Sequence, residues 1–327
     1  MRRYIFSRVI AIIPLLFGIS LLSFAVIHLA PGKPTDVQLQ LNQKVSLQVR
    51  ERLEKLYGLD QPLAVQYGRW VGRMLRFDFG ESFMDGRPVS AKIAERIPIT
   101  LGINVLSLLL ILALAVPIGV LSAVYERQWF DRVMTVLVFV GFALPTFWLA
   151  LLLINLFGVQ LRWLPVSGIR SLRFDEMGPL GQALDYARHL ILPISVSAFT
   201  SLAGLSRYMR TNMIQVLRQD YIRTAFAKGV PARTVYFRHA LKNAILPLVT
   251  ILGLSVPGLI GGSVIFESIF AIPGMGKLFF DAVMSRDRPV IMGILVIGAL
   301  LTLAGNLLAD VSYSLVDPRI RQPGERS

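Results

Sequence analysis

Long uncharged segments are the feature that most constrains this sequence. A membrane-spanning helix needs about 20 mostly apolar residues to cross a hydrocarbon core of roughly 30 Å. Five segments of that length contain no Asp, Glu, Lys or Arg, and a shorter sixth is weaker but could be extended by Ser206–Tyr208 if Arg207 reaches toward the headgroups. We predict an all-α polytopic membrane protein with six spans, at Val9–Leu29, Thr100–Val124, Val133–Val159, His189–Leu205, Ala244–Phe266 and Val290–Ala309.

The composition agrees with a location in a membrane. Hydrophobic residues make up 54% of the 327 residues and charged residues only 17%, and the mean hydropathy is +0.60. The chain has no cysteine, which excludes disulfides and thiolate metal sites. The first apolar segment could be a signal peptide, but it is long for a signal core and His28–Pro31 lacks a small-x-small cleavage site. We expect it to be retained as a span.

The basic residues predict which ends of the spans face the cytoplasm. Because cytoplasmic loops carry an excess of Lys and Arg, we place the N- and C-termini inside. The inner segments then have a net charge of +10 and the outer segments +4. The formal charge of +14 is thus explained by membrane topology, and we expect no nucleic-acid partner. The inner segments are Met1–Arg8, Glu126–Arg132, Ser206–Asn243 and Asp310–Ser327.

Residues suited to catalysis or ion coupling are scarce. No charged side chain lies deep in a predicted span, whereas ion-coupled carriers usually hold ionisable groups there. The residues that could serve such a role are His28, for which an interfacial or hydrogen-bonded side chain is the simpler interpretation, and Asn104, Asn155 and Asn306. These three Asn are candidates to line the pathway, but hydrogen bonding between helices is the simpler interpretation. The nearest approach to a nucleotide-binding loop, Ala271–Leu278, has Ala and Leu where Gly and Ser or Thr are required. We predict no catalytic residue, no metal site and no enzymatic activity.

A structured region of about 70 residues is predicted outside the membrane between the first two spans. Ser46 suits the start of an amphipathic helix and Gly58 its end. A second amphipathic helix follows Pro62, with Tyr67 and Trp70 on one side. We expect these helices to lie on the membrane surface, to dock a partner, or to do both.

The segment Ser206–Asn243 carries eight basic residues and a single acid, Asp220. Asp220 suits the start of a short helix, and Lys228 followed by Gly229 suits its end. Pro231 is placed to begin the next helix. Binding of anionic lipid headgroups is one interpretation of such a basic segment, and docking of a partner protein is the other. Four apolar residues share one stripe of the first helix: Tyr221, Ile222, Ala225 and Phe226.

This arrangement resembles the coupling loop of permeases from binding-protein-dependent ABC transporters. In that family Glu-Ala-Ala, three residues and Gly precede an Ile-x-Leu-Pro element. Here Arg223–Ala225 stands in the Glu-Ala-Ala place, Gly229 matches the glycine, and Ala244–Pro247 stands for the final element. The Arg in first position and the longer stretch before Pro247 are similar to the peptide and nickel branch of the family.

Further segments resemble the same branch in the same order. They are Met1–Pro34, Tyr57–Pro62, Asp78–Ser82, Glu267–Gly276 and Asp317–Arg321. The resemblance implies the first, B-type, permease subunit and the type I ABC importer fold, with six transmembrane helices and a helical extracytoplasmic loop after the first.

The resemblance also implies a function and partners. Such a permease forms half of the pathway by which an ATP-driven importer moves di- or oligopeptides across the inner (plasma) membrane of a bacterial cell. Its partners are a homologous second permease, two cytoplasmic ATPases that use ATP and Mg, an extracytoplasmic substrate-binding protein, and the lipid bilayer. Import of nickel or another small solute by the same machinery is the first alternative, and a self-sufficient secondary carrier is the second.

The expected domains are 1–29 (cytoplasmic N-terminus and first span), 30–99 (extracytoplasmic loop) and 100–327 (permease core, with the coupling loop at about 206–243). The expected ATPase-coupling residues are Asp220, Tyr221, Ile222, Arg223, Thr224, Ala225, Phe226, Lys228, Gly229 and Pro231. The residues expected to face the binding protein are Trp70, Asp78, Gly80, Glu267, Pro273 and Gly274.

Overall fold

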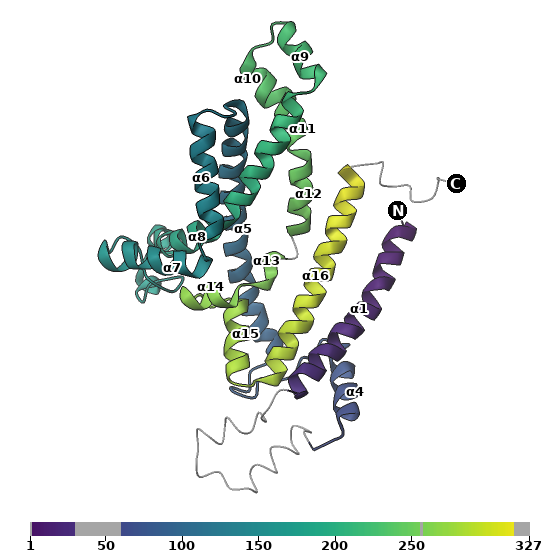
Figure 1. Cartoon of the computed structure of the whole chain (residues 1–327). Coiled ribbons are helices and arrows are strands. Elements are labelled where there is room, and N and C mark those ends of the chain that lie inside the picture. Colours follow the sequence, from purple (N-terminus) through teal and green to yellow (C-terminus); the bar gives the residue numbers. More distant parts are fainter. Residues whose placement is uncertain (1, 30–59, 256–257, 317–327) are drawn as a thin grey trace. The chain divides into compact units, whose positions relative to one another are not determined.

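The computed structural model describes residues 2–29, 60–255 and 258–316. These residues form helices and loops, with one isolated β-bridge between Glu81 and Pro88 (Figure 1). They divide into two compact units, the first made of residues 1–100, 260–264 and 273–327, and the second of residues 101–259 and 265–272. The predicted all-α fold is therefore confirmed, and the expected domain boundaries stay a prediction.

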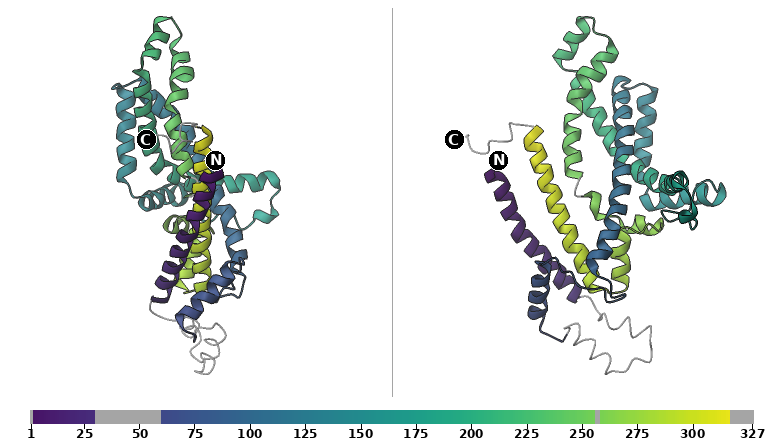
Figure 2. Two further views of the ribbon diagram at one scale, coloured as in Figure 1. Left: turned by 90° about the vertical axis from the view of Figure 1, so that its right-hand side faces the viewer. Right: turned by 180° about the vertical axis from the view of Figure 1, so that it is seen from behind.

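The first unit contains α1 (Arg2–Leu29), α4 (Leu63–Met74), the start of α5 (Val89–Val124), α15 (Met275–Met284) and α16 (Arg288–Val316). Helices α1 and α16, from opposite ends of the chain, lie side by side in Figures 1 and 2. The predicted amphipathic helix after Pro62 is α4. Its aromatic side packs against Phe24 of α1, with the Tyr67 and Phe24 ring centroids 5.2 Å apart. The other predicted exterior helix, Ser46–Gly58, lies outside the described residues.

The second unit is built around α8 (Pro179–Leu217), against which the rest of α5 and α6 (Trp129–Ala143) pack. Small residues allow these helices to approach closely, as is usual between membrane helices. A side chain added at Gly119 of α5 would meet the Met209 Cβ at 2.6 Å, and one added at Gly141 of α6 would meet the Ala203 Cβ at 3.4 Å. The unit also contains α7 (Thr146–Leu153), η1 (Ile154–Gln160), η2 (Phe174–Glu176), α9 (Asp220–Ala227), α10 (Ala232–Thr234), η3 (Val235–Ala240), α11 (Leu241–Ala244) and α12 (Leu246–Ser255).

Among the described residues, three helices are long and apolar enough to cross a membrane alone: α5, α8 and residues 288–307 of α16. Two bent helix pairs bring the number to as many as five, and α1 contains a shorter apolar segment at Ile13–Val26. The count of six spans stays a prediction. The short helix α13 (Gly258–Gly261) follows α12 within the predicted fifth span, and α14 (Val264–Ile269) begins within that span and ends beyond it.

The predicted span Val133–Val159 is wrong as one continuous helix. The chain turns by 102° between α6 and α7. The reason is local, because Pro145 clashes with a helical conformation of the residue before it, and Leu144 accordingly adopts an extended conformation with ψ of 121°. Hydropathy reports the apolar character of both helices but not this turn.

The predicted span His189–Leu205 is too short. Helix α8 has 39 residues, which correspond to about 58 Å at 1.5 Å per residue. It begins with Pro179 at its first position, where a missing N–H costs nothing. This length exceeds the hydrocarbon core of roughly 30 Å. Because α8 ends at Leu217, it extends into the segment predicted as a cytoplasmic loop, Ser206–Asn243.

Candidate functional site

Helix α9 begins and ends where the sequence predicts, at Asp220 and Ala227. Gly229 has a φ of +76°, its N–H donates to the Phe226 carbonyl at 2.9 Å, and the Val230 N–H donates to the Ala225 carbonyl at 3.2 Å. These two bonds form a Schellman cap, which requires the left-handed conformation that glycine adopts most easily. Pro231 lies immediately before α10, which begins at Ala232. The predicted sequence of helix, glycine turn and helix is confirmed, and Figure 1 shows it at one end of the second unit.

The apolar stripe of α9 is divided between the interior and the surface. Ile222 is 0% exposed and belongs to a buried cluster with residues of α5, α8, η3 and α12, and Ala225 packs against the same cluster. Tyr221 and Phe226 are instead 45% and 41% exposed. Ile222 therefore already fills the protein's own core, and Tyr221 and Phe226 are the exposed residues of the stripe; its role in docking a partner stays a prediction.

The two exposed aromatic side chains are held in place by neighbours. The Tyr221 hydroxyl accepts a hydrogen bond from Asn243 Nδ2 at 2.8 Å. The Phe226 ring meets Tyr236 edge to face, with the ring centroids 6.0 Å apart. These contacts reduce the conformational freedom that the side chains would lose on binding. The other expected coupling residues on this surface are also exposed: Asp220, Arg223, Thr224, Lys228, Gly229 and Pro231.

The sequence analysis missed a partly buried ion pair in the second unit. Arg210 of α8 donates from Nε to Asp131 Oδ1 at 2.6 Å and from Nη2 to Asp131 Oδ2 at 2.7 Å. The Arg127 N–H donates to Asp131 Oδ2 at 2.8 Å. Asp131 thus ties the start of α6 to α8 near the end that leads to α9. The available signal was an acid beside an apolar segment, but nothing local identified a partner 79 residues away.

Asp78 and Gly80 form a turn in the first unit. Asp78 accepts hydrogen bonds from Arg73 Nε and from the Gly80 N–H, both at 2.9 Å. The hydrogen bond from Arg73, and to a smaller extent the one from the Gly80 N–H, hold the pKa of Asp78 below its ordinary value of 3.8. Gly80 has a φ of +80°, so glycine suits this position. Asp78 remains exposed and available to a partner.

Asp287, which the sequence analysis also missed, is buried just before α16 and holds this loop. It accepts hydrogen bonds from the Ser82 hydroxyl and from the Phe83 N–H, the latter at 3.1 Å. Lys92 Nζ donates to Ser82 Oγ at 3.2 Å and to Asp85 Oδ2 at 2.8 Å. Partial burial raises the pKa of Asp85, but the hydrogen bonds from Lys92 and Ser82 outweigh it and lower the pKa to about 2. The loop before α5 is thereby fixed to the start of α16.

The other residues expected to face a binding protein are less accessible. Trp70 lies against α1, with its ring centroid 6.2 Å from that of Phe24. Glu267 and Gly274 are buried, and Pro273 is half buried. The role of these residues in docking stays a prediction, and in this conformation Asp78 is the most exposed of the set.

Comparison with known proteins identifies the family. Residues 115–322 match the family described as binding-protein-dependent transport system inner membrane component. Residues 1–104 match the N-terminal part of binding-protein-dependent transport system membrane components. The chain belongs to this family of transport permeases.

Individual permeases of the family match along nearly the whole chain. The oligopeptide transport system permease protein AppB of Bacillus subtilis is 46% identical over 98% of this chain and 99% of its own length. A putative peptide transport system permease protein of Brucella abortus is 38% identical over 98% of this chain and 99% of its own length. The dipeptide transport system permease protein DppB of Alkalihalophilus pseudofirmus is 36% identical over 98% of this chain and its full length.

Membership confirms the resemblance read from the coupling loop. The chain is an inner-membrane permease component and a multi-pass membrane protein. The polar residue Asn104, within a span of this permease, donates from Nδ2 to the Leu259 carbonyl at 2.7 Å. Its interpretation as a hydrogen bond between helices is thus confirmed.

Proposed function

We propose that this chain is a permease subunit of an ATP-driven importer and forms half of the pathway for di- or oligopeptides. The observation that carries the proposal is the 46% identity, over nearly the full length of both chains, to a permease named for oligopeptide transport. Import of nickel or another small solute by the same kind of assembly is the alternative. The selectivity would come mainly from an extracytoplasmic binding protein that delivers the solute.

The energy source in this proposal lies outside the chain. ATP and Mg are used by two cytoplasmic ATPase subunits, and a homologous second permease completes the pathway. The N- and C-termini and α9 face the cytoplasm of a bacterial cell, in agreement with the excess of basic residues around α9. On the outer side, the exposed Asp78 is the residue of this turn that is available to a binding protein, whereas Gly80 is half buried.

Helix α9 couples the ATPases to the permease. Its exposed aromatic pair, Tyr221 and Phe226, enters a groove on an ATPase, as in other helix-in-groove interactions. Its buried residue, Ile222, joins α9 to the helix core. For ATP binding to change the conformation of the permease, the contacts with α9 must differ in free energy between the two states.

The coupling role is tested with Phe226→Ala and Tyr221→Ala in the complete transporter, reconstituted in vesicles. Loss of an aromatic residue from an interface costs about 2 kcal/mol or more at a hot spot, so uptake and substrate-stimulated ATP hydrolysis should each fall at least tenfold. Phe280→Ala is the matched control, because Phe280 is also 41% exposed but lies in α15. Normal uptake by both α9 variants would refute the coupling role.

The substrate is tested by purifying the transporter with its binding protein and measuring uptake of labelled di- and oligopeptides and of nickel. Uptake of peptides that requires ATP and the binding protein supports the proposal. Uptake of nickel alone favours the alternative. If the isolated chain in liposomes accumulates solute on an ion gradient, the chain is a secondary carrier and the importer proposal fails.

A further inference from the structure

The surface around α9 carries more positive charge than the chain itself compensates. Between the end of α8 and the end of α11, six basic side chains are exposed, together with one acid, Asp220. Two of the six have a carboxylate within ion-pair distance: Arg218 lies 3.5 Å from Glu126, and Arg223 lies 3.7 Å from Asp220. In the part of the chain that the structure describes, no carboxylate lies within ion-pair distance of the other four. These four side chains form the basic cluster: Lys228, Arg233, Arg238 and Lys242.

Two members of the basic cluster lie beside the exposed aromatic pair of α9. Lys228 follows α9 directly and is two residues from Phe226. Lys242 precedes Asn243, whose Nδ2 donates to the Tyr221 hydroxyl at 2.8 Å. A protein interface typically has aromatic anchors near its centre and polar or charged groups at its rim. The surface of α9 and α11 therefore suits a protein partner that contacts the aromatic pair and the basic side chains together.

Anionic lipid headgroups would also attract basic side chains, but the orientation of α9 does not suit a membrane surface. An interfacial helix turns its apolar face toward the lipid, whereas α9 turns Ile222 into the protein's own core. At about 100° per residue, the side of α9 opposite Ile222 is formed by Asp220, Thr224 and Ala227. This outward side is exposed and carries no large apolar side chain. The Asp220 side chain is 98% exposed there, and its carboxylate would be repelled by anionic headgroups.

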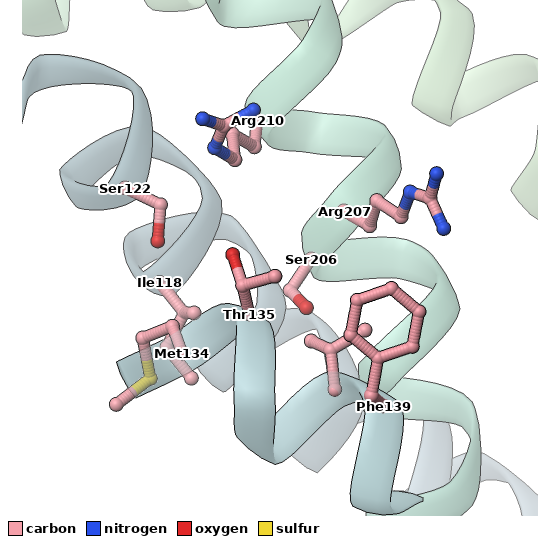
Figure 3. A pocket seen from close by; sticks show the side chains of 9 residues that line it. Ile118, Ser122, Met134, Thr135, Phe139, Ser206, Arg207 and Arg210 are labelled. Atoms are coloured by element: carbon pink, nitrogen blue, oxygen red, sulfur yellow. The ribbon is translucent and has the colours of Figure 1, made fainter. Parts of the chain in front are cut away.

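Basic side chains elsewhere on α8 are placed differently. They lie at a cavity of about 250 Å³ that residues of α5, α6 and α8 line (Figure 3). Asp131 binds Arg210 with both carboxylate oxygens and compensates its charge. Figure 3 shows the Arg207 side chain directed away from Arg210, on the Phe139 side of the cavity. Arg207 is thus an exposed basic residue of the second unit outside the surface of α9, and it is suited to serve as a control.

We infer that the basic cluster docks onto acidic side chains of the ATPase subunit that receives α9. This inference rests on the proposed coupling role of α9, and it specifies the chemistry of the partner's surface. Carboxylates of the ATPase lie opposite Lys228 and Lys242, one beside each residue of the aromatic pair. They accept charge-assisted hydrogen bonds from the two ammonium groups. Together with the charges of Arg233 and Arg238, they attract the two proteins to each other before contact.

The basic cluster and the aromatic pair act on different rate constants. Charges at the rim of an interface typically change the association rate and its dependence on salt, whereas most other interface substitutions change the dissociation rate. The Debye length is about 10 Å at 0.1 M salt and about 3 Å at 1 M, so the attraction is strong at low salt and largely screened at high salt. Removal of the lysines should therefore slow association, and removal of Phe226 should speed dissociation.

The test measures the binding kinetics of the ATPase subunits to the full-length permease, paired with its second permease in nanodiscs of phosphatidylcholine, which has no net charge. At about 0.05 M salt, Lys228→Gln/Lys242→Gln should lower the association rate constant about five-fold and leave the dissociation rate constant nearly unchanged. At about 0.5 M salt, this variant and the unmodified protein should associate at similar rates. The matched control Arg132→Gln/Arg207→Gln removes the same charge from exposed positions of α6 and α8, and should change the association rate by less than about two-fold.

Three results would overturn the inference. They are an unchanged association rate of the lysine variant, an equal loss in the arginine control, and a loss that appears only when phosphatidylglycerol is added to the nanodiscs, which would show binding of anionic lipid. The lysine variant should fold with an unchanged Tm, because exposed side chains without an ion-pair partner contribute little to stability.

Phe226→Ala separates this inference from the proposed function. If Phe226→Ala binds and releases the ATPase normally, the coupling role of α9 fails, and the inference fails with it. If Phe226→Ala dissociates faster while the lysine variant associates normally, the coupling role stands and only the acidic surface of the partner is refuted.

Discussion

Removal of the Asp131 carboxylate should destabilise the second unit by about 2–3 kcal/mol. Loss of one partner from a buried ion pair costs roughly 3–5 kcal/mol when the remaining charge is fully buried. Asp131 is 4% exposed, but the Arg210 side chain is 29% exposed and is partly screened by solvent, which reduces the cost. The Arg127 N–H also loses its acceptor, a loss of about 1 kcal/mol that is included in this range. Asp131→Ala should therefore be among the more destabilising single substitutions in the second unit.

The assay is thermal unfolding of the purified permease in detergent, followed by circular dichroism. For a domain of this size, 2–3 kcal/mol corresponds to a decrease in Tm of about 4–12 °C. Asp175→Ala is the matched control, because Asp175 pairs with Arg170 at 3.5 Å but is 83% exposed, and its Tm should change by less than about 2 °C. The double variant Asp131→Ala/Arg210→Ala should be more stable than the sum of the single changes predicts. Equal Tm values for Asp131→Ala and Asp175→Ala would refute the reasoning.

Three further predictions concern packing, pH and the coupling helix. Gly119→Ala should cost about 1–3 kcal/mol by overpacking against Met209, measured as a decrease in Tm, whereas Gly102→Ala in the same helix, with no atom within 4 Å of the added Cβ, should not destabilise. Because the pKa of Asp85 in the folded protein is lowered to about 2, the stabilisation by its carboxylate is present above the unfolded pKa of 3.8 and is lost as the pH falls to about 2. This stabilisation is below about 1 kcal/mol because Asp85 is partly exposed. The Tm values of the unmodified protein and of Asp85→Asn should therefore differ near about pH 6 and converge near about pH 2. Ile222→Ala should lower the free energy of unfolding by about 2–4 kcal/mol and should lower uptake, whereas binding of the ATPase, measured by co-purification, should persist. If Ile222→Ala lost as much ATPase binding as Tyr221→Ala and Phe226→Ala, the separation of anchoring from docking would be contradicted.

Local chemistry allowed much of α9 to be predicted. Asp220, Lys228, Gly229 and Pro231 each act within a few residues of their position, and the helix, its cap and the following helix start were all found in the structure. The stripe of α9 was identified, but its inner and outer halves were not distinguished. Ile222 is buried by residues of helices that are distant in the sequence. No local sequence pattern distinguishes a side chain that packs into the protein's own core from one that stays exposed for a partner.

The features that the sequence analysis missed depend on distant residues or on one backbone angle. Ser82 and Asp287 are 205 residues apart, and each residue alone is typical of a polar loop. The turn between α6 and α7 depends on the conformation that Pro145 imposes on Leu144, inside a segment whose hydropathy is uniform. Periodicity and hydropathy average over many residues and are insensitive to both kinds of information.

On the proposed function, the separation of anchoring from docking explains how so short a helix could serve as a coupling element. An isolated helix of eight residues is not stable in water, so α9 depends on its glycine cap and on the burial of Ile222. Because the interior is close-packed and resists compression, a displacement imposed at Tyr221 and Phe226 passes through Ile222 to α8 and is not absorbed locally. The same helix would lose this property if its whole apolar stripe were exposed, since it would then have no rigid connection to the bundle. On the proposed function, the burial of Ile222 is therefore as necessary for transport as the exposure of its two aromatic neighbours.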